Sequence, residues 1–75
     1  MKSELSKMVN TNKLKAKMVE KGYTQEQLAR EMGISSAAFS RRMANVSDFA
    51  VGEVGVLIEI LDIAESELVP IFFNH

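Results

Sequence analysis

The side chains of this sequence that could do chemistry are concentrated between residues 35 and 45. Four of them have helical spacing and would share the outer face of one short helix: Ser36, Ala37, Ser40 and Arg41. Hydroxyls donate and accept hydrogen bonds, an alanine methyl can contact a thymine methyl, and an arginine can donate two hydrogen bonds to guanine. These residue types suit the reading of base-pair edges in a groove of DNA.

Catalytic and metal-binding constellations are missing from the sequence. There is no cysteine, the single histidine is the terminal His75, and neither a paired histidine and acid nor a Gly-rich phosphate loop occurs. We therefore expect no enzyme activity, no metal, no cofactor and no small-molecule substrate. No apolar run approaches the about 20 residues of a membrane span, and no signal-peptide pattern opens the chain. A cytoplasmic protein is expected.

Two short helices joined by a tight turn must position the face that could read bases. Thr24 and Gln27 have the spacing of a capping box, which starts a helix, and Gly33 suits the left-handed conformation that ends one. Ser35 is placed to cap the second helix. Residues 24–45 are therefore predicted to form a helix-turn-helix.

This segment resembles a known family. The pattern Q-x-x-L-A-x-x-M-G-I-S-x-x-x-F-S-R at residues 25–41 is similar to that of the phage Cro/repressor type of helix-turn-helix protein, the XRE-like group. The resemblance covers about residues 12–72 and implies a λ-repressor-like DNA-binding domain. Its recognition helix, about Ser36–Ala44, would lie in the major groove of double-stranded DNA. The family usually has an apolar residue in place of Arg42, so Met43 is expected to fill that core position.

The resemblance also implies functional residues and a partner. The family's base-reading positions map to Ser36, Ala37, Ser40 and Arg41. Gln25 is similar to the family's phosphate clamp at a helix N-terminus. Further phosphate contacts are expected from Thr24, Ser35, Arg42 and Asn45. A Cro-like or prophage repressor-like regulator is implied, which binds as a homodimer to half-sites about 34 Å apart.

A helix is also expected before the motif. Asn10 is its predicted cap and Gly22 its end, with Leu14 and Met18 facing inward. Four lysines would lie on its exposed side: Lys13, Lys15, Lys17 and Lys21. Residues 1–9 are expected to be a flexible tail, and the alternative is a basic arm that lies along DNA.

A fourth helix is predicted after the motif. It opens at Ala50, which lacks the side-chain oxygen of a good cap. An apolar stripe should hold it in place: Val54, Leu57, Ile58 and Leu61. Gly52 and Gly55 weaken this helix, or else they permit close contact with another helix.

A short last helix completes the expected fold. It should run from Ala64 or Glu65 to about Val69, because Pro70 disfavours a helical conformation in the residue before it. Five short helices, short loops and the absence of strand alternation predict an all-α bundle. Residues 10–75 would form a single domain.

Charge divides the sequence into two halves. All nine Lys and Arg residues lie within residues 1–45, where four acids leave a balance of +5. Residues 46–75 carry six acids and no Lys or Arg. A basic half that contains the motif has the charge expected of a phosphate-binding surface, although charged faces are often only solvated.

The C-terminal half offers an alternative function. Three large apolar residues near the end of the chain either fold back on the core or form a dimer contact: Ile71, Phe72 and Phe73. A protein-interaction module of the antitoxin type could mask a partner with the acidic and apolar residues 48–73. The basic half argues against this alternative, because an obligate protein clamp would not need it.

Overall fold

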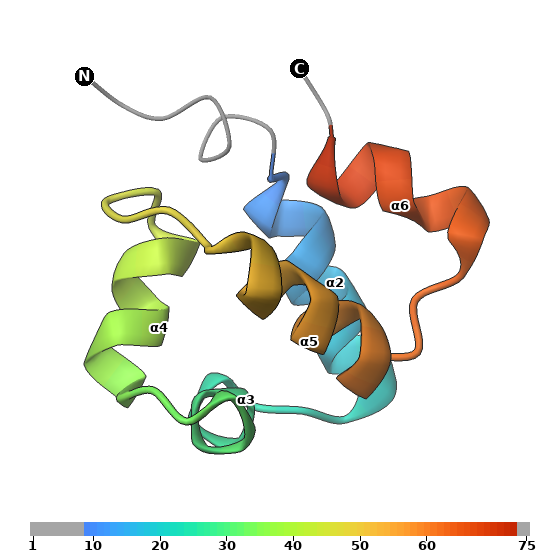
Figure 1. Cartoon of the computed structure of the whole chain (residues 1–75). Helices are drawn as coiled ribbons and strands as arrows, with labels where there is room; N and C mark the ends of the chain where they lie inside the picture. The colour runs from blue at the N-terminus through green and yellow to red at the C-terminus, as the bar shows by residue number, and fades with distance from the viewer. Residues whose placement is uncertain (1–8, 74–75) are drawn as a thin grey trace.

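Five α-helices account for most of residues 9–73, the part of the chain described by the computed structural model. They are α2 (Thr11–Lys21), α3 (Gln25–Met32), α4 (Ser36–Met43), α5 (Val51–Ile60) and α6 (Glu65–Phe72). Figure 1 shows α3 nearly end-on below α4, while α5 crosses in front of α2 and α6 packs beside α2. The all-α fold is confirmed, and residues 9–73 contain no strand.

Three helices, α2, α3 and α4, begin where the sequence predicted them to begin, because side-chain caps fix these positions. Asn10 Oδ1 accepts a hydrogen bond from the Lys13 N–H at 3.0 Å, and α2 follows. Thr24 and Gln27 form the complete capping box at the start of α3. α2 and α3 both end at a left-handed glycine, Gly22 with φ 79° and Gly33 with φ 73°.

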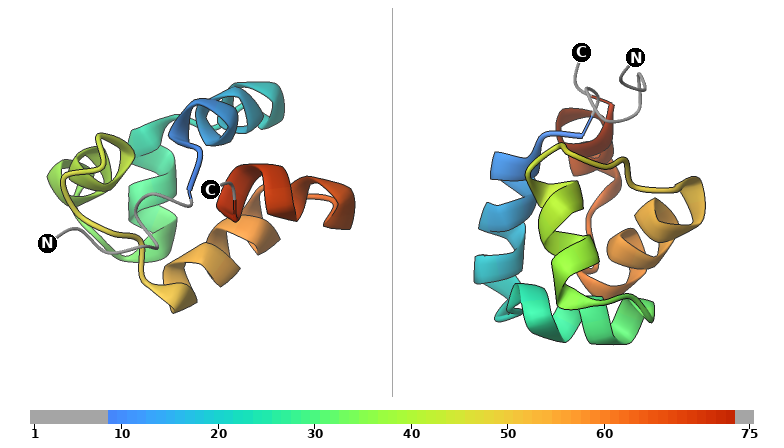
Figure 2. Two further views of the ribbon diagram at one scale, coloured as in Figure 1. Left: turned by 90° about the horizontal axis from the view of Figure 1, so that it is seen from above. Right: turned by 90° about the vertical axis from the view of Figure 1, so that its left-hand side faces the viewer.

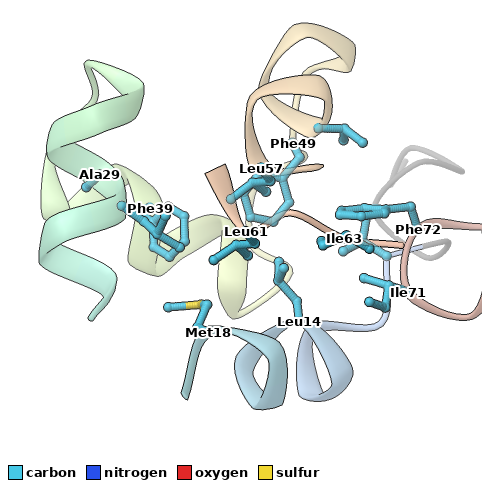
Figure 3. Close-up of a cluster of buried hydrophobic side chains, with 13 residues drawn as sticks. Leu14, Met18, Ala29, Phe39, Phe49, Leu57, Leu61, Ile63, Ile71 and Phe72 are labelled. Carbon is cyan, nitrogen blue, oxygen red and sulfur yellow. The ribbon is translucent and has the colours of Figure 1, made fainter. Parts of the chain in front are cut away.

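The core lies where the inner faces of the helices meet, as Figure 3 shows. Its largest fully buried side chains are Phe39, Phe49, Phe72, Leu14, Leu28, Leu57 and Leu61. The Phe39 and Phe49 rings meet edge to face, with centroids 5.8 Å apart and planes at 71°. Burial of each such side chain contributes about 1.5–3 kcal/mol, so these contacts fix the helices that carry the site.

The last helix is longer than predicted. α6 continues through Pro70 to Phe72 instead of ending near Val69. Proline removes one backbone donor from the helix, but Ile71 and Phe72 then reach the core with 3% and 0% of their surface exposed. The Asn10 N–H also donates to the Ile71 carbonyl at 2.6 Å.

This burial corrects the expected dimer contact. Ile71 and Phe72 fold back on the chain's own core, so their side chains are not available to a second copy. Phe73 is 48% exposed. The predicted tail, residues 1–9, lies outside the described residues except for Val9, which is buried and packs in the core.

Two further expectations for the helix surfaces change. Lys17 is not exposed with the other lysines of α2. It is 8% exposed, and its Nζ lies 3.1 Å from Glu20 Oε1 and 2.7 Å from Glu67 Oε2. A Cβ at Gly52 or Gly55 would meet no atom within 4 Å, so these glycines permit no close helix contact. They only weaken α5.

Candidate nucleic-acid interface

The α3–α4 pair forms the predicted helix-turn-helix. α3 ends at Met32, residues 33–35 make the turn, and α4 begins at Ser36. The Ile34 N–H donates to the Ala29 carbonyl at 3.0 Å and closes the end of α3. Ser35 Oγ accepts the Ala38 N–H at 3.0 Å and starts α4. The end of α3 and the start of α4 are therefore both fixed by hydrogen bonds within the turn.

α4 lies at the outside of the molecule. Figure 2, right, shows it in front of the other helices, with α3 below it. Phe39 anchors its inner face in the core with no exposed surface. The four residues predicted to point outward are all exposed: Ser36, Ala37, Ser40 and Arg41. Among residues 9–73, no side-chain hydrogen bond or ion pair engages Ser36, Ser40 or Arg41, so their polar atoms are open to a ligand.

A polar depression borders this face. Its volume is about 250 Å³ and its lining comes from three helices: Thr11, Asn12 and Lys15 of α2, Gln25 of α3, and Ser40, Met43 and Ala44 at the end of α4. Gln25 is the first residue of α3, where backbone N–H groups lack helical partners and the helix dipole is positive. Amide, hydroxyl and ammonium groups beside a helix N-terminus suit a phosphate.

Two of the expected phosphate ligands already have structural roles. Thr24 Oγ1 accepts the Gln27 N–H at 3.1 Å, and Ser35 Oγ accepts the Ala38 N–H at 3.0 Å. Both residues are exposed, so each caps its helix and is still accessible from solvent. Asn45 is half-buried with φ 62°, and its N–H donates to the Arg42 carbonyl at 3.1 Å. It takes the left-handed position after α4 that glycine takes after α2 and α3.

Arg42 differs most from the sequence prediction. Its side chain is 20% exposed, and Arg42 Nε donates to Glu53 Oε1 on α5 at 2.9 Å. An intramolecular carboxylate therefore competes with the expected phosphate contact. Met43 is half-buried and packs against the core, as predicted from the departure at Arg42.

Sequence reasoning missed Thr11, Asn12 and Lys15 as residues beside the site, and Glu53 as the partner of Arg42. Lys15 was one of four lysines on the expected exposed side of its helix, and nothing in their spacing distinguishes it. The positions depend on how the start of α2 packs near α3 and α4, which is a tertiary property. Glu53 lies three residues after Ala50, but its partner Arg42 is eleven residues away in the sequence and on another helix.

Neither a metal site nor a membrane span is found in the described part of the chain. Residues 9–73 contain no group of three or more His, Cys, Asp or Glu side chains that could hold a metal ion. None of their helices combines the length and the apolar character needed to cross a bilayer.

Comparison with known proteins agrees with this geometry. A family model described as helix-turn-helix matches residues 14–68, which include all of α3, α4 and α5. Searches among curated proteins and among solved structures gave no match.

Proposed function

Because the chain belongs to the Cro/XRE-type helix-turn-helix family, a family of DNA-binding regulators, we propose that it is a sequence-specific transcriptional regulator of the Cro-like or prophage-repressor kind. α4 lies in the major groove of double-stranded DNA. The observation that carries this proposal is the outer face of α4, whose polar side chains are exposed and have no partners within residues 9–73.

Base reading is assigned to the outer face of α4. Arg41 is the strongest reader, because a bidentate hydrogen bond to guanine contributes about 1–3 kcal/mol of discrimination. Ser36 and Ser40 can donate or accept and therefore discriminate less. The exposed Ala37 methyl can contact a thymine methyl.

Phosphate binding is assigned to the polar depression beside α4. Gln25 and the free N–H groups at the start of α3 hold one phosphate, with Lys15 supplying a positive charge from α2. Thr24 and Ser35, which cap their helices, lie beside the same DNA strand as this phosphate. Asn45 contacts the DNA backbone at the C-terminal end of α4. Contacts of this kind position the protein without reading sequence.

A homodimer is part of the proposal. α4 has only eight residues and reads one half-site, so two copies would bind half-sites about 34 Å apart. Of the three residues expected to form the contact between copies, only Phe73 has its side chain exposed.

The test is selection from a randomised pool of DNA at two salt concentrations. We compare the wild type with Arg41→Ala, and with Arg30→Ala as the control. Arg30 is an exposed arginine on α3, so its removal changes the charge equally without touching the outer face of α4.

We expect one enriched motif for the wild type and an affinity that falls steeply with salt. Arg41→Ala should lose the preference at one base pair, whereas Arg30→Ala should keep the motif. The symmetry of the motif would identify the dimer. If the wild type enriches no sequence and Arg41→Ala binds as the wild type does, the proposal is wrong, and the acidic residues 48–73 become the surface to test for a protein partner.

A further inference from the structure

One carboxylate of α5 joins the end of the recognition helix to the start of the next helix. Glu53 Oε1 accepts from Arg42 Nε at 2.9 Å, and the two side chains are only 19% and 20% exposed. The same oxygen accepts from the backbone N–H of Ala50 at 2.9 Å. Ala50 is the N-cap residue of α5 and has no side-chain oxygen of its own to cap the helix. Glu53 therefore fixes the last turn of α4 relative to α5.

This link joins α4 to a helix on which it packs only sparsely, and it lies beside Met43, which packs against the core at the same end of α4. α4 packs closely on α3, but its packing against α5 is much sparser. On the α5 side, the Phe39 ring contacts the Phe49 ring of the connecting segment. That contact holds the middle of α4, and the Arg42–Glu53 pair holds its C-terminal end. Two attachment points on the α5 side resist a tilt of α4 better than one does.

The neighbouring arginines of α4 are used differently. Arg41 is exposed and has no ion pair within residues 9–73, whereas Arg42 is directed toward α5 and its Nε is engaged. A hydrogen bond between two charged groups is roughly twice as strong as a neutral one. Partial burial also reduces the screening of this pair by salt. The pair is therefore suited to holding a helix in one orientation.

Resting on the proposed function, we propose that Glu53 is a positioning residue for DNA recognition that acts through Arg42. The pair fixes the angle at which α4 enters the major groove, and Arg42 itself makes no contact with DNA. Hydrogen bonds to base edges weaken steeply when their angles are wrong. A change in the tilt of α4 would therefore reduce discrimination between bases more than it reduces general attraction to phosphate.

The experiment compares Glu53→Gln with Glu59→Gln. Both variants remove one negative charge from α5, and Glu59 is exposed without an ion pair in the described residues. Glutamine keeps an oxygen for the Ala50 N–H, so Glu53→Gln weakens mainly the link to Arg42. The measured quantity is the affinity for the enriched motif divided by that for a motif with one changed base pair. This ratio is insensitive to the general effect of charge on DNA binding.

We expect Glu53→Gln to lower this ratio by about threefold to tenfold, while Glu59→Gln leaves it unchanged. Arg42→Met should lower the ratio to a similar extent without changing the slope of affinity against salt. In the double variant Arg42→Met/Glu53→Gln the ratio should fall no further than in either single variant, because the two residues act as one unit. Circular dichroism at the assay temperature confirms that each variant is folded, and Glu53→Asp replaces Glu53→Gln if the latter unfolds.

Three results would overturn this inference. A loss of about one unit of salt slope in Arg42→Met would show a direct phosphate contact. A wild-type ratio in folded Glu53→Gln would show that the link has no role in recognition, while the proposed function would stand. A wild-type protein that prefers no sequence would overturn both this inference and the proposed function.

Discussion

At the turn between α3 and α4, two adjacent serines have separate functions. Ser35 Oγ accepts the Ala38 N–H at 3.0 Å, whereas Ser36 is exposed on the outer face of α4. Ser35→Ala should lower the free energy of unfolding by about 0.5–2 kcal/mol, because it removes a helix cap. Ser36→Ala should change it by less than about 0.5 kcal/mol. Urea denaturation of the two variants measures both values.

The effects of these two substitutions on DNA binding should have the opposite order to their effects on stability. Ser36→Ala should reduce the preference for the enriched motif, and Ser35→Ala should retain it at a temperature where it is folded. Equal losses of stability in the two variants would contradict the assignment of the cap to Ser35.

Residue-scale features could be predicted where both partners lie close together in the sequence. The Thr24–Gln27 capping box and the left-handed Gly33 follow from neighbouring residue types, and both were predicted correctly. The roles of Lys17 and Arg42 could not be predicted this way. Their partners, Glu67 and Glu53, lie on later helices, and only the packing of those helices brings the charges together.

At the scale of helices, α5 starts with an incomplete cap. Ala50 has φ −74° and ψ 156°, the same backbone conformation as the capping Ser35. Glu53 already accepts the Ala50 N–H, so a serine at residue 50 would complete a capping box. Ala50→Ser should raise the free energy of unfolding by about 1 kcal/mol and Tm by about 4–8 °C.

Thermal unfolding followed by circular dichroism measures this gain. Ala16→Ser is the control, since Ala16 is exposed within α2 and a serine there caps nothing. Serine is a poorer helix former than alanine in a helix interior, so this control should lose stability slightly. An Ala50→Ser variant no more stable than the wild type would show that Glu53 alone satisfies the start of α5.

Helix starts were predicted better than helix ends or the site. Each start has a local signal, and the predicted caps Asn10, Thr24 and Ser35 are all used. The end of α6 was wrong, because burial of Phe72 outweighs the local preference imposed by Pro70. The depression beside α4 has no local signal, since its lining comes from three different helices.

At the scale of the whole molecule, some charges of the basic and acidic halves of the sequence pair with each other and link helices. Two cations of the basic half pair with acids of the acidic half, Lys17 with Glu67 and Arg42 with Glu53. These pairs link α2 to α6 and α4 to α5. Five other Lys and Arg residues are exposed within residues 9–73: Lys13, Lys15, Lys21, Arg30 and Arg41. The positive charge available to DNA is therefore smaller than the sequence count indicates, and salt dependence should reflect this smaller set.

The Lys17–Glu67 pair makes stability depend on pH in a defined direction. The hydrogen bond from Lys17 holds the pKa of Glu67 below its ordinary value of 4.5, and the bond to Glu67 raises the pKa of Lys17 above 10.5. A lowered carboxyl pKa contributes stability above the ordinary value that is lost as pH falls. A raised ammonium pKa contributes stability below its ordinary value that is lost as pH rises. Both contributions are present between these limits.

Glu67→Gln should therefore flatten the acid side of the stability profile. The free energy of unfolding, measured by urea denaturation from about pH 6 to about pH 3, should fall less steeply in Glu67→Gln than in the wild type. Glu65→Gln is the matched control, because Glu65 lies on the same helix, is exposed and has no ion pair within residues 9–73. Its profile should follow that of the wild type. Parallel profiles for the wild type and Glu67→Gln would mean that the pair does not fasten α6 to α2 in solution, and the buried Ile71 and Phe72 would then hold α6 alone.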